Sequence, residues 1–122
     1  MNRLLVYTRQ HTCADQERAR LCLQEFGVPV NEINISREPE AAQILNELIG
    51  SLAVPTLMVV DEDSNLIEPL RPIGRHESVR DVDRGAVISE PSREGLRRFL
   101  IKHGFLNNQT VAAGSVKQNV AP

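Results

Sequence analysis

The N-terminal half of the chain alternates short apolar runs with longer amphipathic segments, and this alternation restricts the possible folds most strongly. Residues 4–7 are a continuous apolar run, which is typical of a parallel strand covered on both faces. Residues 14–26 carry apolar side chains at helical spacing, residues 28–35 are rich in β-branched side chains, and residues 38–49 again have a helical period. A glycine follows each helical segment as a stop signal. The order strand, helix, strand, helix predicts two parallel strands joined by a right-handed crossover.

The C-terminal half adds two predicted strands and one helix. Residues 57–60 form an apolar strand, and the polar cluster 61–65 indicates a hairpin loop that returns through residues 66–67 as an antiparallel edge strand. Residues 70–89 hold four arginines among acidic residues without a regular period. We expect a long, mostly exposed loop there, which is either functional or contains a short undetected element. Residues 91–103 have the apolar stripe of a last helix, so the predicted order is βαβαββα.

Length and composition favour one domain and exclude several classes of partner. We expect residues 1–105 to form the domain and residues 106–122, which lack apolar periodicity, to form a disordered tail. The net charge of −2, with both signs mixed along the chain, argues against a nucleic-acid partner. The N-terminal apolar run is too short for a signal peptide or a membrane span. The sequence therefore predicts a cytoplasmic protein without a membrane partner.

The chain has two cysteines, Cys13 and Cys22, and only the first is a candidate nucleophile. Cys13 lies where the first strand passes into the first helix, and unpaired N–H groups and a partial positive charge at a helix N-terminus favour a thiolate. Asp15, in the first turn, opposes the thiolate by like-charge repulsion. Cys22 falls on the apolar stripe and is expected to be a small buried hydrophobe. The two thiols lie about 13.5 Å apart along one helix, so they cannot pair, and no metal-ligand spacing exists.

The order and spacing of these motifs resemble the glutaredoxin family of the thioredoxin fold. Residues 6–9 followed by Cys13 look like the family's first strand and active-site loop, in which a basic residue precedes the nucleophilic cysteine. Residues 54–56 are similar to the family's T-V-P segment, whose proline is cis and lies against that cysteine. Residues 60–69 look like the hairpin of the mycoredoxin branch. The resemblance implies an α/β, thioredoxin-like fold with a four-stranded mixed sheet flanked by helices.

The active-site motif differs from both standard forms of the family. The usual C-P-Y-C is Cys13-Ala14-Asp15-Gln16 in this chain, so the second cysteine is absent, as is the C-G-F-S signature of the iron–sulfur class. The resemblance then implies a one-thiol mechanism, in which Cys13 attacks a mixed disulfide and a second thiol regenerates it. It implies glutathione or a similar low-molecular-weight thiol as cosubstrate, with no covalently bound cofactor. The substrate would be a disulfide-containing or thiolated protein.

The resemblance also assigns substrate-binding residues around Cys13. Arg9 is expected to pair with the glycyl carboxylate of a glutathione-like ligand. A cis bond before Pro55 would turn the backbone of Val54 toward the ligand and hold Thr56 near Cys13. The family's Gly-Gly-Asp stretch, which holds glutathione in many members, is not found.

Three further residues are minor candidates. His11 lies two residues before Cys13 and is a possible proton donor to a leaving thiol. Arg71 and Arg75 are possible replacements for the missing glutathione contacts. Two alternative functions stay open: a redox-silent thioredoxin-fold module that binds a partner, and a carrier in which Cys13 from two chains and two glutathione thiolates hold an iron–sulfur cluster.

Overall fold

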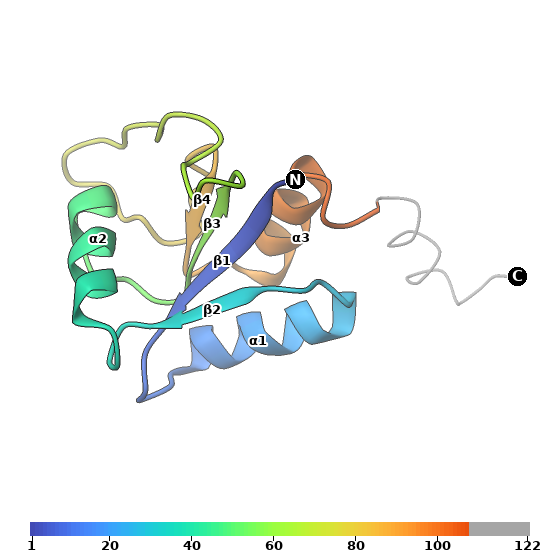
Figure 1. Cartoon of the computed structure of the whole chain (residues 1–122), viewed down its shortest axis with the longest axis horizontal. Helices are drawn as coiled ribbons and strands as arrows, with labels where there is room; N and C mark the ends of the chain where they lie inside the picture. The colour runs from blue at the N-terminus through green and yellow to red at the C-terminus, as the bar shows by residue number, and fades with distance from the viewer. Residues whose placement is uncertain (108–122) are drawn as a thin grey trace, which may run out of the picture.

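A computed structural model describes residues 1–107 of the chain and contains one four-stranded mixed sheet (Figure 1). Residues 108–122, which include most of the predicted tail 106–122, lie outside the described residues. The central strand β1 runs parallel to β2 and antiparallel to β3, and β3 runs antiparallel to β4. The order across the sheet is β2-β1-β3-β4, where the strands are β1 (Arg3–Thr8), β2 (Asn31–Asn34), β3 (Thr56–Val60) and β4 (Val87–Ser89).

Three helices cover the two faces of the sheet, and the alternation of side chains along β1 explains the division. Leu4 and Val6 join the apolar cluster that includes the buried residues of α1 (Ala14–Phe26) and α3 (Arg93–Lys102). Tyr7 points to the opposite face and packs in the cluster formed with α2 (Pro39–Ile49). Figure 1 shows α2 on one side of the sheet and α1 and α3 on the other. This is the α/β, thioredoxin-like fold that the sequence predicts.

The helix boundaries follow from local signals in the sequence. Gly27 and Gly50 end α1 and α2 in the left-handed region, with φ of 70° and 77°, where a side chain would be strained. The hydroxyl of Ser92 accepts a hydrogen bond from the Gly95 backbone N–H at 3.0 Å and so caps the start of α3. The three predicted helices are confirmed, with ends that differ by at most two residues.

The fourth strand is not where the sequence suggests. The polar turn is present, since the Asp61 carboxylate accepts the backbone N–H groups of Asp63 and Asn65. Leu66, however, forms only a single bridge to Val60, so the predicted edge strand at residues 66–67 is wrong. The strand that completes the sheet is β4, and its three residues are fully buried.

The segment between β3 and β4 (residues 61–86), called the insertion, folds back on the sheet. The loop expected at residues 70–89 contains a short element that the sequence did not identify, because residues 84–89 are buried and include β4, whereas residues 74–78 are exposed as expected. Two hydrogen bonds join Arg71 and Arg84: the Arg71 backbone N–H donates to the Arg84 carbonyl at 2.9 Å, and the Arg84 side chain donates from Nε to the Arg71 carbonyl at 2.8 Å. Within residues 1–107, no helix is long and apolar enough to cross a membrane.

Candidate active site around Cys13

Cys13 is the residue on which α1 begins. Its backbone is extended, with φ −130° and ψ 173°, and its carbonyl accepts the Glu17 N–H at 3.0 Å, which is the first hydrogen bond of the helix. The side chain makes no capping hydrogen bond, and the free thiol is partly exposed. A partly exposed thiol at a helix N-terminus occupies the position in which nucleophilic cysteines are found.

Gln16, which stands where a second cysteine is usual, fastens the active-site loop to the helix. Its Oε1 accepts the backbone N–H of Arg9 at 3.1 Å, and its Nε2 donates to the Arg9 carbonyl at 3.0 Å. The side chain is only 9% exposed. The start of the loop that carries Cys13 is thus bound to the helix that follows it. Sequence reasoning noted only the missing cysteine and overlooked this role.

Asp15 is paired with two arginines. Arg80 donates two hydrogen bonds to its carboxylate, from Nη1 at 2.5 Å and from Nη2 at 2.7 Å, and Arg18 donates one at 2.9 Å. These contacts, with Arg80 first, hold the pKa of Asp15 below its usual value. The repulsion of a Cys13 thiolate that Asp15 was expected to exert is therefore opposed by two cations.

Arg80 also connects this first turn to the segment around Pro55. Its Nη1 lies 3.5 Å from the Glu90 carboxylate, and the Glu90 backbone N–H donates to the Pro55 carbonyl at 2.7 Å. The predicted arginines of the same insertion lie differently, since the guanidinium of Arg71 donates to the backbone carbonyl of Asp83. Arg80 is the arginine of this insertion that reaches the helix of Cys13, and no signal in the sequence distinguishes it from the other three.

Residues 54–56 are the buried bend at 54–55 and the first residue of β3. The Val54–Pro55 peptide bond is cis, as predicted. All three side chains are buried, and the Thr56 hydroxyl donates to the Ala53 carbonyl at 2.7 Å, so the Ser89 hydroxyl, also at 2.7 Å, must donate to Thr56. The Thr56 hydroxyl is therefore occupied by contacts within the protein, and the contact of Val54 with a ligand stays a prediction.

Two further predicted residues lie in the loop that precedes Cys13. Arg9 and His11 are both exposed, and Arg9 Nε donates to the His11 carbonyl at 3.1 Å, which stiffens the loop. Their contacts with a ligand stay predictions, as do those of Arg71 and Arg75. Cys22, in contrast, is buried in the core as predicted, and its sulfur accepts a hydrogen bond from Arg93 at 3.4 Å.

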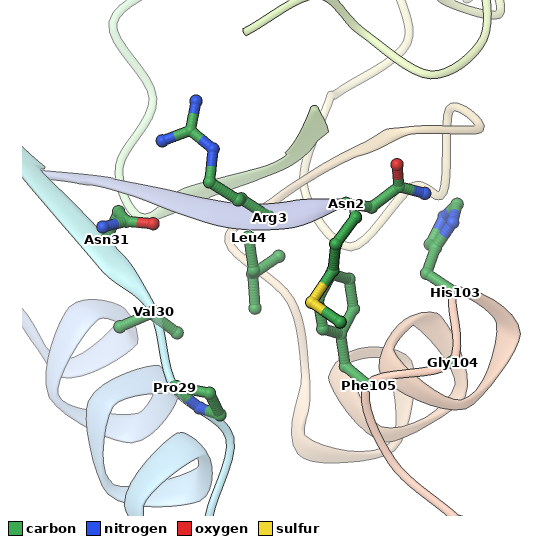
Figure 2. A pocket seen from close by; sticks show the side chains of 10 residues that line it. Asn2, Arg3, Leu4, Pro29, Val30, Asn31, His103, Gly104 and Phe105 are labelled. Atoms are coloured by element: carbon green, nitrogen blue, oxygen red, sulfur yellow. The ribbon is translucent and has the colours of Figure 1, made fainter. Parts of the chain in front are cut away.

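Two cavities flank β1. One, of about 240 Å³, lies between α1 and the sheet, and Thr8, Gln16 and Pro55 line its end nearest the Cys13 loop. The larger one, of about 550 Å³, lies at the start of β1, where Leu4 and Phe105 line it together with Pro29, Val30 and His103 (Figure 2). The length of β1 separates this larger cavity from Cys13 by roughly 17 Å, so it is not a cosubstrate site for that thiol.

The described residues contain no group of three or more His, Cys, Asp or Glu side chains able to hold a metal ion.

Residues 4–63 match the family model described as Glutaredoxin, and this range contains Cys13, Gln16 and Pro55 but neither β4 nor α3. The match supports a glutaredoxin-like family, and it agrees with the mixed four-stranded sheet and its three helices. Comparisons with curated proteins and with solved structures gave no significant match.

Proposed function

We propose that this glutaredoxin-like chain is a thiol–disulfide oxidoreductase that works through the single thiol of Cys13. The family match suggests thiol–disulfide chemistry. The observation that carries the proposal is the partly exposed, uncapped thiol at the N-terminus of α1. Because Gln16 stands where a second cysteine is usual, Cys13 has to be regenerated by an external thiol. We propose glutathione or a similar low-molecular-weight thiol for this step.

The proposed cycle has two exchange steps. The Cys13 thiolate attacks the glutathione sulfur of a substrate–glutathione disulfide, so that this S–S bond breaks, a Cys13–glutathione disulfide forms and the substrate thiolate leaves and takes up a proton. A second glutathione thiolate then attacks the bound glutathione sulfur and releases Cys13 and glutathione disulfide. The net reaction consumes one free glutathione thiol per cycle: substrate–glutathione disulfide and glutathione give the substrate thiol and glutathione disulfide.

We assign binding of the low-molecular-weight thiol to the residues around Cys13. Arg9 is exposed in the loop and is proposed to pair with a carboxylate, and the backbone of Val54, beside the cis bond to Pro55, is proposed to contact the ligand. Thr56 supports this turn from within, through its hydroxyl contacts. His11, exposed in the same loop, is the candidate proton donor to the leaving thiol.

The finer family assignment and the location belong to the same proposal. Glu90 and Pro91 follow β4, and no Gly-Gly pair stands there, which supports the mycoredoxin-type branch. We propose a cytoplasmic location, where low-molecular-weight thiols keep Cys13 reduced. The proposed substrates are proteins that carry a disulfide or a mixed disulfide.

The test is reduction of a mixed disulfide between glutathione and a small thiol, with glutathione as reductant. We expect turnover by the wild type and by Cys22→Ser, and only the uncatalysed rate with Cys13→Ser. Mass spectrometry of a stalled reaction should find one glutathione on Cys13. Equal rates for the wild type and Cys13→Ser would refute the proposal and favour the redox-silent binding module.

A further inference from the structure

The ion pair between Arg80 and Asp15 joins residues that are 65 positions apart in the sequence. Both Nη atoms of Arg80 contact the carboxylate, at 2.5 and 2.7 Å, in the two-pronged geometry that fixes the relative orientation of the groups. The Asp15 side chain is only 13% exposed, whereas Arg80 is 51% exposed. Arg80 therefore covers Asp15 from the solvent side.

Asp15 lies in the first turn of α1, two residues after Cys13. A carboxylate in this turn weakens the positive end of the helix and repels a thiolate. Arg18, on the next turn, supplies one compensating cation. Arg80 supplies the second, so the net charge beside Cys13 depends on a segment that is distant in sequence.

The backbone around Arg80 is itself fixed, which distinguishes this pair from an accidental surface contact. Arg80 forms a parallel bridge with Ser89 of β4. The next residue, Asp81, donates its N–H to the Ser89 carbonyl at 2.8 Å and accepts the Ser92 N–H at 2.8 Å, at the N-terminus of α3. The sheet and α3 thus hold Arg80 in the position from which it reaches Asp15.

We propose that Arg80 is a positioning residue for the reaction of Cys13: by pairing with Asp15, it removes the negative charge that would otherwise face the thiolate. The inference rests on the proposed function only in taking Cys13 as the nucleophile. It gives a role to the insertion between β3 and β4, which the sequence suggests to be a solvated loop.

The test is the rate at which Cys13 of the full chain reacts with iodoacetamide at pH 7, followed by mass spectrometry of the Cys13 peptide. Iodoacetamide is uncharged, so Arg80 cannot act by attracting the probe. We expect Arg80→Gln to slow the reaction about three- to tenfold, since Arg18 alone then compensates the charge of Asp15 in the first turn. The double variant Asp15→Asn/Arg80→Gln should react at close to the wild-type rate. Arg80→Lys keeps the positive charge, so its alkylation rate should fall less than that of Arg80→Gln.

Arg93→Gln is the matched control. Arg93 also binds a carboxylate of α1 from another element with both Nη atoms, at 3.0 and 2.5 Å, and it is also 51% exposed. Its partner Glu25 is ten residues beyond Asp15, about 15 Å further along the helix, so we expect the rate at Cys13 to be unchanged.

Two results would overturn the inference. An Arg80→Gln rate equal to that of Arg93→Gln would show that Arg80 does not affect Cys13. A double variant as slow as Arg80→Gln would show that Arg80 acts by holding the structure and not by compensating Asp15. Alkylation does not require turnover, so a charge effect on Cys13 without mixed-disulfide reduction would leave this inference standing and refute the proposed function alone.

Discussion

Replacing Gln16 by Ala should release the loop of Cys13 from α1. The change removes two hydrogen bonds to the backbone of Arg9, of 3.1 and 3.0 Å, from a side chain that is only 9% exposed. Each bond of this kind contributes about 1 kcal/mol, and the better helix propensity of Ala offsets roughly 0.4 kcal/mol. We therefore expect the free energy of unfolding to fall by about 1.5–2 kcal/mol, and the melting temperature to fall by roughly 6–8 °C.

Urea unfolding measures this loss, and Gln24→Ala is its control. Gln24 lies on the same helix but is exposed, so the same change there should alter the free energy of unfolding by less than about 0.5 kcal/mol. A looser loop should also misplace the thiol, so Gln16→Ala should reduce mixed-disulfide turnover about tenfold, beyond the effect of Gln24→Ala.

The reasoning fails if the two variants unfold at the same urea concentration. In that case the amide of Gln16 would contribute no more to the free energy of unfolding than the exposed amide of Gln24. If the free energy of unfolding falls as predicted but the rate of mixed-disulfide reduction is unchanged, Gln16 contributes to stability and not to catalysis.

Three further predictions concern the core, the buried hydroxyls and the pH dependence. Phe99→Ala should lower the free energy of unfolding by about 3–5 kcal/mol, because the ring is completely buried, whereas Ile44→Ala, at a side chain 53% exposed, should cost far less; equal urea midpoints would contradict the packing described. Thr56→Val should cost about 1–3 kcal/mol, and a double-mutant cycle with Ser89→Ala should give a coupling energy clearly above zero. The pKa of Glu94 is lowered from 4.5 to about 2, mainly by a hydrogen bond from Arg97. This pairing stabilises the fold above the unfolded pKa and is lost as pH falls through the folded one, so the difference in urea midpoint between the wild type and Glu94→Gln should shrink from about pH 5 to about pH 2.5; a difference independent of pH would refute it.

Most of the fold was predictable because its signals are local. Each helical segment shows apolar residues at helical spacing and is followed by a stop signal, so α1 and α2 end at the expected glycines. The strand β4 has only three residues, and its identity comes from pairing with β3, in which Ser89 lies opposite Thr56. Leu66 and Ile67 follow a polar turn signal in the sequence, but Leu66 makes only a single bridge, to Val60, and so lacks the partners that a strand requires.

The candidate site was predictable only in part, for the same reason. The position of Cys13 follows from its immediate neighbours in the sequence, whereas the cis bond at Pro55 was predicted from the resemblance of residues 54–56 to a family segment. Gln16 left a usable signal, because it extends the apolar stripe of Ala19 and Leu23 at helical spacing, so a buried polar side chain with partners was to be expected there. Arg80 left none, since its contact with Asp15 depends on how the insertion folds.

The first turn of α1 contains two acidic residues close in sequence to Cys13, and both are paired with arginines. Asp15 and Glu17 both lie in the first turn of α1, which follows Cys13, and would together offset the positive end of the helix. Both carry arginine partners that lower their pKa, and Glu17 in addition accepts the Thr12 hydroxyl at 2.7 Å. Arg20 and Arg18 belong to the helix itself, but Arg80 comes from the insertion between β3 and β4. Because the helix supplies its other compensating arginines locally, the electrostatic state of the site varies with the insertion through Arg80, and a change in that segment would act on Cys13 without touching the active-site loop.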